Sequence, residues 1–238
     1  MTKEIKNLLI KIQSDRLFND FYFVGGTALS YYLNHRISYD LDFISLSHLK
    51  THNLKTLIVK FNAGFIPDQN ASVFKINSGE NIEKYKMMFM IDKVKIEFFY
   101  PNDPIREEIV KKYSKHSKYI NQNIKILPIE AIAQLKVIAL FRRNKIRDLF
   151  DVYVLLEHEV ITVDLLERFY SAEIAQSTLV EFIEVFKDDG SESLDFSSEN
   201  RYYNDFSMLA KDEKTERIKQ RIVELLVDQA ITQKEYLR

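Results

Sequence analysis

Glycine and proline are scarce in this chain, and this limits the folds that it can adopt. Only 5 Gly and 4 Pro occur among 238 residues, which is too few turn-forming residues for an all-β sandwich or barrel. Two of the glycines are adjacent, Gly25 and Gly26, after the apolar run 21–24 and before a helix-like segment that extends to Asn34. We therefore expect strands combined with helices, with one sharp strand-to-helix turn at this pair.

The composition is that of an ordinary globular protein, with 46% hydrophobic and 29% charged residues. No apolar run reaches the roughly 18 residues of a membrane span. Residues 1–15 form an amphipathic pattern without the long apolar region of a secretory signal. The absence of cysteine excludes a disulfide scaffold, a thiol nucleophile and thiolate metal sites. We expect a cytoplasmic protein that does not enter membranes.

Apolar spacing and turn residues predict the elements of the first half of the chain. Helical spacing predicts a helix over residues 3–18, and alternation of apolar residues with acids predicts a strand over residues 39–44. Ser47 is expected to cap a helix over residues 48–62. Further predicted strands cover residues 71–77, 85–91 and 94–100, and the last two are expected to form a hairpin through Asp92-Lys93.

The second half of the chain is predicted to be helical. Pro128 suits the first turn of a helix that runs to Arg143. Further helices are predicted over residues 146–158, 162–187 and 212–232, with a Ser- and Asp-rich loop at residues 188–200. The predicted fold class is α+β: a mixed-sheet domain over residues 1–125, followed by a helical bundle over residues 126–238.

Charge is unevenly distributed along the chain. Residues 106–147 carry 11 basic and 3 acidic side chains, whereas residues 148–238 carry 10 basic and 21 acidic ones. The middle segment is expected to attract polyanions and the last third to repel them. The alternative is that exposed helices simply carry charge, and the sequence leaves both open.

Two acids, Asp40 and Asp42, are separated by one residue in the predicted strand 39–44. Residues two apart on a strand share a face, with Cα atoms roughly 6.5–7 Å apart, while Tyr39, Leu41 and Phe43 are expected to face the core. Two carboxylates this close repel each other unless a cation lies between them. The pattern therefore favours a divalent metal site, and Mg²⁺ prefers carboxylate oxygens together with substrate phosphate.

Glu97 is the acid of a second strand-like run, residues 94–99. If this strand lies beside the first, about 4.8 Å away, its carboxylate comes within reach of Asp40 and Asp42. Three carboxylates can hold two metal ions about 3.5–4 Å apart, the arrangement that clamps the attacking and leaving oxygens in phosphoryl transfer. The alternative reading of Asp40 and Asp42 is an exposed pair on an edge strand.

The turn Gly25-Gly26-Thr27 is a candidate phosphate site. Glycine lets the backbone approach a phosphate closely, and a helix N-terminus offers N–H groups that lack partners and a partial positive charge. The alternative is a tight turn without a ligand, which the two glycines alone would also explain.

The stretches around these residues resemble a known family. Residues 25–29 and 35–43 resemble the first motif of the AbiEii/AbiGii toxin family of nucleotidyltransferases, part of the DNA polymerase β-like superfamily. The superfamily pattern is a helix-opening Gly-Gly or Gly-Ser, two acids one residue apart, and a third acid on a later strand. Glu97 matches the third position in kind, although aspartate is more usual there. Ser38 also lies in the matching motif, as a candidate phosphate contact or a plain strand-entry hydroxyl.

A second stretch, residues 127–155, resembles the family's helical motif through Lys136 and Arg147–Asp151. The resemblance implies that Lys136 contacts a triphosphate and that Asp148 lies in the same cleft. The residues themselves also allow plainer roles: Lys136 as a snorkelling side chain on an apolar helix, and Asp148 as part of a salt-bridge ladder on a helix. The region after Asp151 shows no match.

Together these features predict a nucleotidyltransferase that uses two Mg²⁺ ions, held by Asp40, Asp42 and Glu97, to move a nucleoside monophosphate from an NTP to an acceptor hydroxyl. Gly25, Gly26, Thr27, Ser38, Lys136 and Asp148 are the expected nucleotide-binding residues. The resemblance implies a toxin that modifies an RNA such as tRNA and is controlled by an antitoxin protein. Two alternatives stay open: a small-molecule acceptor such as an aminoglycoside, and a non-catalytic nucleotide-binding module.

Overall fold

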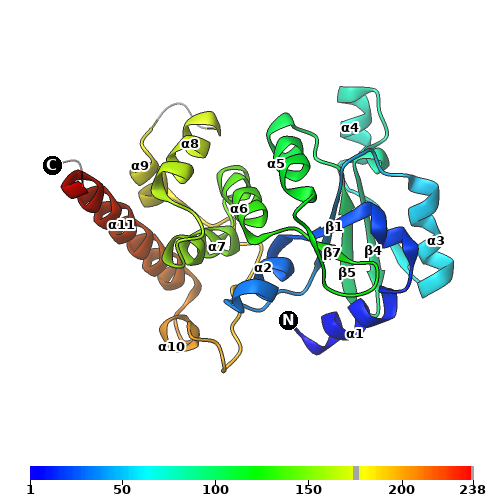
Figure 1. The fold of residues 1–238 in the computed structure, drawn as a ribbon, viewed down its shortest axis with the longest axis horizontal. Helices are drawn as coiled ribbons and strands as arrows, with labels where there is room; N and C mark the ends of the chain where they lie inside the picture. The colour runs from blue at the N-terminus through cyan, green and yellow to red at the C-terminus, as the bar shows by residue number, and fades with distance from the viewer. Residues whose placement is uncertain (174–176, 237–238) are drawn as a thin grey trace. The chain divides into compact units, whose positions relative to one another are not determined.

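The computed structural model describes residues 1–173 and 177–236, with side chains up to residue 228. The chain divides into two compact units, Met1–Ile132 and Ala133–Arg238, which run from blue to green and from green to red in Figure 1. This division falls inside helix α6 (Ile129–Arg143), whereas the sequence-based boundary lies at 125/126. The division into domains over residues 1–125 and 126–238 stays a prediction.

The first unit is built around a mixed sheet that, in the described residues, has seven strands in the order β3-β4-β5-β2-β1-β7-β6. β2 pairs antiparallel with β1 and parallel with β5. The strands are β1 (Phe21–Val24), β2 (Leu41–Ser45), β3 (Gly64–Ile66), β4 (Lys86–Ile91), β5 (Val94–Phe99), β6 (Lys118–Tyr119) and β7 (Lys125–Ile126). The α+β fold class predicted from the sequence is confirmed.

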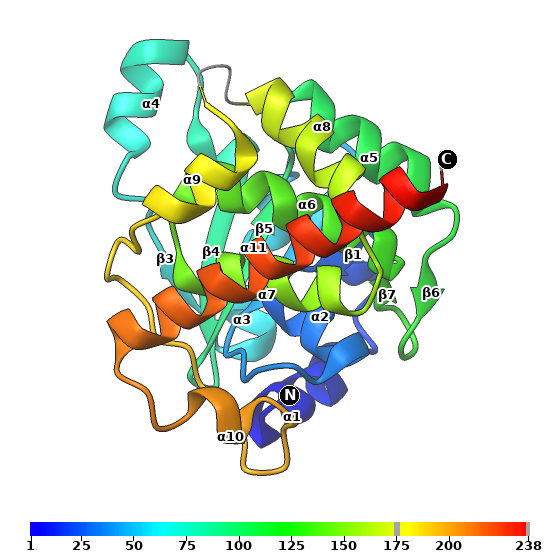
Figure 2. The same ribbon diagram turned by 90° about the vertical axis from the view of Figure 1, so that its left-hand side faces the viewer.

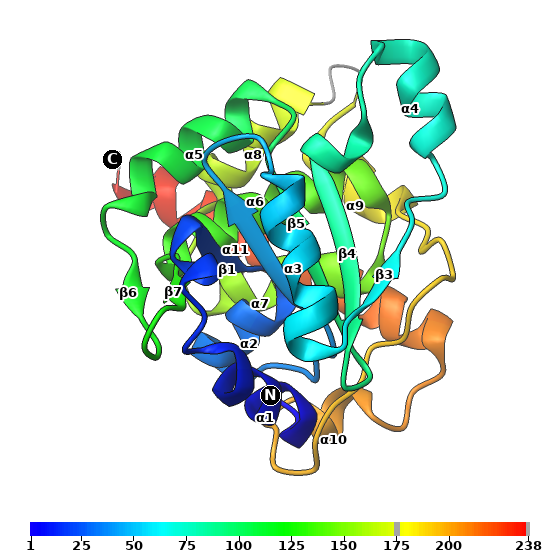
Figure 3. The same ribbon diagram turned by 90° about the vertical axis from the view of Figure 1, so that its right-hand side faces the viewer.

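Phenylalanines at alternate positions of the central strands form the core on one face of this sheet. The rings of Phe43 on β2 and Phe98 on β5 stack with centroids 5.4 Å apart, and Phe18 meets Phe43 edge-on at 5.1 Å. Helices α1 (Lys3–Ile12) and α3 (Thr51–Phe61) lie in front of the sheet in Figure 3, and α2 (Gly25–Leu33) lies on the opposite side from α3 in Figure 1. Because strand side chains alternate, residues between these phenylalanines face away from the aromatic core.

The hairpin between β4 and β5 is confirmed, with Ile91 opposite Val94. Asp92 and Lys93 have φ of 49° and 68°, both in the left-handed region. A two-residue turn with two positive φ angles matches the right-handed twist of the flanking strands, so it fixes the register of the pair.

Three local predictions in the first unit are wrong. The helix predicted over residues 3–18 ends at Ile12, because the Asp15 side chain accepts a hydrogen bond from the Leu17 N–H and starts a separate 3₁₀ turn. Residues 71–77 are part of helix α4 (Ala71–Ser78) rather than a strand. Gly79 ends that helix with φ +73°, and its N–H donates to the carbonyl of Lys75, so helix-terminating chemistry outweighs the strand propensity of Val73 and Ile76.

The predicted cap at Ser47 is also wrong, because α3 begins only at Thr51. The N–H of Leu49 donates to the carbonyl of Lys84. This bond holds the segment before Thr51 against the 3₁₀ turn Ile82–Lys84 and outside the helix. The remaining elements of the first unit are α5 (Pro104–Ser114) and two 3₁₀ turns, Arg16–Asp20 and Ile82–Lys84.

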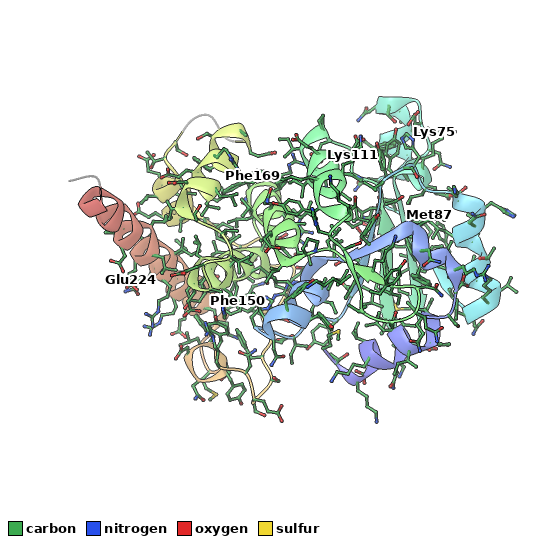
Figure 4. The ribbon with its side chains drawn as sticks, viewed as in Figure 1. Lys75, Met87, Lys111, Phe150, Phe169 and Glu224 are labelled. Carbon is green, nitrogen blue, oxygen red and sulfur yellow. The ribbon has the colours of Figure 1, made fainter. Side chains whose placement is uncertain are left out.

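The second unit is helical, as predicted. Helix α7 (Ile146–Glu157) is buried along most of its length, and α11 (Lys211–Tyr236) packs against it and against α9 (Leu179–Val185), as Figure 2 shows. Phe150, labelled in Figure 4, is fully buried and meets Phe206 edge-on at 5.5 Å. The other helices are α8 (Val163–Glu173) and α10 (Tyr203–Phe206).

The predicted helix over residues 162–187 corresponds to two helices, α8 and α9, and its residues 174–176 lie outside the described part of the chain. None of the helices in the described residues combines the length and the apolar character needed to cross a bilayer.

Candidate active site

Asp42 lies against the glycine that opens helix α2. Gly25 has φ +77°, and a Cβ built on it would come within 2.0 Å of Asp42 Oδ2. Only a glycine fits both the left-handed backbone and this close approach. The carboxylate of Asp42 is thus placed at the start of α2, where the helix presents backbone N–H groups.

Thr27 fixes the other acid through its backbone. Its side chain is fully buried, and its hydroxyl donates to the carbonyl oxygen of Asp40 at 2.5 Å. The hydroxyl of Thr27 is therefore a positioning group that ties the first turn of α2 to the residue just before β2. Binding of a triphosphate by Thr27 stays a prediction. The group that would bind is the backbone N–H of this turn, since the hydroxyl is already used.

Gly26 lies beside a buried arginine and a buried serine. A Cβ on Gly26 would come within 2.5 Å of an Arg36 guanidinium nitrogen and 3.0 Å of Ser38 Oγ. Arg36 and Ser38 are 3% and 5% exposed, and the guanidinium donates to the carbonyl of Ile37. The segment before Asp40 is therefore packed closely onto the glycine turn. Ser38 remains a predicted phosphate contact.

The structure places Glu97 directly beside Asp42. In the parallel pairing of β2 with β5, Asp42 is in register with Glu97, and Phe43 with Phe98. Phe43 and Phe98 belong to the aromatic core, so Asp42 and Glu97 share the other side of the sheet. We call the three carboxylates Asp40, Asp42 and Glu97 the acid face. Tyr39, which was expected in the core, is 48% exposed because it precedes the strand.

Two lysines that the sequence reasoning missed lie on the acid face. Lys95 precedes Glu97 by two residues on β5, and its Nζ lies 2.9 Å from Asp40 Oδ2. Lys86 of β4 lies 3.3 Å from an oxygen of Asp68 and 3.7 Å from Glu97 Oε2. The alternation of β5 was the available signal, since it puts Lys95 on the same side as Glu97.

The electrostatics of Lys95 reflect all three acids. Burial lowers its pKa, but the hydrogen bond to Asp40 and the negative charges of the acid face outweigh burial, so the pKa lies above the ordinary value. Lys95 is therefore held firmly as an ammonium ion.

The donor chemistry of the acid face fits a magnesium ion, because carboxylate oxygens are the ligands that Mg²⁺ prefers. One of these carboxylates, Asp40, already pairs with a cation, the ammonium of Lys95. In the described residues, however, no three acidic or histidine side chains converge closely enough to hold a metal ion. That Asp40, Asp42 and Glu97 hold magnesium stays a prediction, and it requires side-chain movements that include release of Asp40 by Lys95.

Lys136 and Asp148 lie in the second unit, where they form a buried ion cluster with Asp151 and Arg143. Lys136 Nζ lies 3.2 Å from Asp148 Oδ1 and 2.7 Å from Asp151 Oδ2. The guanidinium of Arg143 contacts both oxygens of Asp148, at 2.9 and 3.1 Å. Lys136, Asp148 and Asp151 are 7%, 2% and 0% exposed. Two bases face these two acids, but the Arg143 side chain is 51% exposed, so three of these four charged groups are buried.

Comparison with known proteins identifies related chains. The family described as "Nucleotidyl transferase AbiEii toxin, Type IV TA system" matches residues 8–234. An uncharacterized protein of Aquifex aeolicus (strain VF5) is 27% identical over 156 residues, which span 66% of this chain and 67% of that protein.

Two solved structures are also similar. A candidate nucleotidyltransferase from Helicobacter pylori has a TM-score of 0.53 at 19% identity, covering 99% of this chain and 95% of that one. MenT4, a nucleotidyltransferase toxin from Mycobacterium tuberculosis H37Rv, has a TM-score of 0.49 at 16% identity, covering 96% of this chain and 86% of that one. The likeness to the Helicobacter structure shows a shared fold.

Proposed function

Because the chain belongs to the AbiEii family of nucleotidyl transferase toxins, and is therefore a nucleotidyltransferase, we propose that its acid face carries out Mg²⁺-dependent transfer of a nucleoside monophosphate from an NTP to an acceptor hydroxyl. The observation that carries this proposal is the register of β2 and β5, which sets Glu97 beside Asp42. The contact between Asp42 and Gly25 adds a helix N-terminus to the same place.

In this reaction the acceptor oxygen forms a bond to the α-phosphorus, the bond to pyrophosphate breaks, and the acceptor proton leaves. Bound magnesium, as two ions, would neutralise the triphosphate and lower the pKa of the attacking hydroxyl. Asp40 and Asp42 would hold the metal, and the Glu97 carboxylate would hold metal and accept the acceptor proton. Most of the rate enhancement in phosphoryl transfer comes from such positioning and electrostatics.

The backbone of Gly25, Gly26 and Thr27 would bind phosphate oxygens through N–H groups at the start of α2. Ser38, packed beside Gly26, would contribute its hydroxyl. Lys136 and Asp148 are proposed to contribute to triphosphate binding as well. For Lys136 this requires exchange of a carboxylate partner for a phosphate, because its ammonium contacts both Asp148 and Asp151.

We propose an RNA such as tRNA as the acceptor, and control by an antitoxin protein, since the family consists of toxins of toxin–antitoxin systems. Because the proposed reaction consumes an NTP and modifies RNA, the cytoplasm is the proposed site of action. A small cationic acceptor such as an aminoglycoside is the second candidate, favoured by the 21 acidic side chains of residues 148–238.

The test is to incubate the protein with Mg²⁺ and each α-³²P-labelled NTP, with either total RNA or an aminoglycoside panel as acceptor. We expect covalent label on RNA. Label on the aminoglycosides alone would favour the second candidate. The Asp42→Ala variant is expected to lose transfer while its melting temperature stays equal to, or rises above, that of the wild type, because a repulsive carboxylate is removed. Wild-type transfer by this variant would show that the site is misassigned.

A further inference from the structure

Lys95 forms an ion pair with Asp40, one of the proposed metal ligands. Its Nζ lies 2.9 Å from Asp40 Oδ2, and the two side chains are 35% and 30% exposed. The backbone carbonyl of Asp40 is in turn tied to the Thr27 hydroxyl. The ammonium therefore approaches a carboxylate whose backbone is already fixed to helix α2.

The neighbouring lysine differs from Lys95 in the acid that it contacts more closely. Lys86 lies 3.3 Å from Asp68 and 3.7 Å from Glu97, so its shorter contact is with an acid outside the acid face. Lys95 forms its ion pair with Asp40 and also experiences the charges of Glu97 and Asp42. Of these two lysines, Lys95 is thus the one whose shorter contact is with the acid face.

We propose that Lys95 is a tethered counter-ion that keeps free divalent metal off the acid face, so that metal enters together with the triphosphate. This inference rests on the proposed function of the same site. An ammonium and a divalent cation on one carboxylate repel each other, and Mg²⁺ sheds its waters reluctantly. Metal that arrives alone must therefore expel Lys95 without offering it a new partner.

A triphosphate changes that balance, because its oxygens are strong acceptors for a displaced ammonium. Metal and triphosphate then bind cooperatively, with each raising the affinity for the other, as linkage requires. Lys95 is in this sense a positioning residue, because it sets the order in which metal and triphosphate bind. When no nucleotide is bound, its ammonium neutralises part of the negative charge of the acid face.

The test measures Mn²⁺ binding to the full chain by electron paramagnetic resonance, with and without inorganic tripolyphosphate, which serves as a probe that does not depend on the base. Wild type, Lys95→Met and Lys93→Met are compared; Lys93 is an exposed residue of the β4–β5 turn and controls for the loss of one positive charge. Lys95→Gln serves as a second variant if Lys95→Met does not fold.

We expect Lys95→Met to bind Mn²⁺ alone at least tenfold more tightly than wild type, and to lose most of the gain in Mn²⁺ affinity that tripolyphosphate gives the wild type. Lys93→Met should behave as wild type. Equal Mn²⁺ affinity in Lys95→Met and wild type would overturn the inference.

Adding Asp42→Ala to each protein separates the two proposals. If Asp42→Ala abolishes Mn²⁺ binding but Lys95→Met leaves it unchanged, only the inference about Lys95 is wrong. If Mn²⁺ binding survives Asp42→Ala in every background, the ion lies elsewhere and the proposed function of the acid face fails with it.

Discussion

The acid face of the first unit and the buried ion cluster of the second unit are made of the same kinds of side chain. In the buried ion cluster, Asp148 and Asp151 are 2% and 0% exposed, and Lys136 and Arg143 balance their charge. On the acid face, Glu97 and Asp40 keep 23% and 30% of their side chains exposed, and Lys86 and Lys95 each contact one of them. Burial requires neutrality, whereas partial exposure tolerates an excess of negative charge.

This difference separates a mostly buried set of ion pairs from a half-exposed group of carboxylates, which is the proposed metal site. Losing one charge from a balanced, buried set leaves a partner unpaired in a low-dielectric environment. Losing one charge from a half-exposed group of neighbouring carboxylates relieves their mutual repulsion. The same substitution should therefore reduce stability in one place and activity in the other.

The largest expected effect is on the acid face. Glu97→Gln keeps the shape of the side chain and removes the charge, so nucleotide transfer should fall about a thousandfold, in the range of a lost catalytic base. The melting temperature should stay the same or rise slightly. Initial rates of label transfer and a thermal unfolding curve check both parts, and near-normal transfer would remove Glu97 from the mechanism.

The matched change in the buried ion cluster should act on folding. Asp151→Asn leaves Lys136 with one carboxylate fewer, so the free energy of unfolding should fall by about 3 kcal/mol. Denaturant titration measures this loss. The double variant Lys136→Met with Asp151→Leu removes both charges and should recover part of the stability, and a loss as large as the sum of two single changes would contradict the charge-balance explanation.

A pair of glycine substitutions sharpens the comparison. Gly25 and Gly190 have nearly equal φ, +77° and +76°, but a Cβ on Gly190 meets nothing within 4 Å. Both alanine variants should be destabilised by roughly 1–2 kcal/mol for the left-handed backbone. Only Gly25→Ala should also push Asp42 aside and lower the transfer rate. Equal rates in the two variants would show that the position of Asp42 is not critical.

The smallest effect concerns a tyrosine of the second unit. Burial, and then the charge of Glu157, raise the pKa of Tyr153 to about 12. The unfolded chain loses this proton near pH 10 while the folded chain keeps it, so stability should fall as the pH rises from about 10 to 12. Denaturant titrations across this range should show a shallower decline for Tyr153→Phe, and identical slopes would argue against the raised pKa.

The sequence was most informative where local geometry and burial agreed. The apolar run at residues 21–24 became β1, and the adjacent glycines became the start of α2, since few residues other than glycine allow φ +77°. The alternation of residues 94–99 predicted both β5 and the side on which Glu97 lies. The sequence did not predict that β5 pairs with β2. It predicted only that Glu97 would reach Asp40 and Asp42 if the two strands were neighbours, because pairing partners depend on the whole sheet.

The wrong and missed predictions arise from contacts between segments that are distant in sequence. Helix α3 begins late because Leu49 bonds to Lys84. Lys95 was overlooked because its importance depends on Asp40, which lies just before a different strand, β2. Arg147 of α7 pairs with Glu192, and Asp151 pairs with Lys136 of α6, so each contact joins two different segments. The roles of Ser38, Lys136 and Asp148 in nucleotide binding stay predictions.

The two-residue turn at Asp92 and Lys93 has a consequence for folding fidelity. A slip of one residue in β5 would bury Glu97 among the phenylalanines and expose Phe98, because neighbouring positions face opposite sides. The left-handed pair at the tip of the hairpin favours the observed alignment of β4 with β5, in which Ile91 lies opposite Val94. Two surface residues that have no proposed role in the chemistry thus help to set, before any substrate is present, the side of the sheet on which the proposed catalytic residue Glu97 lies.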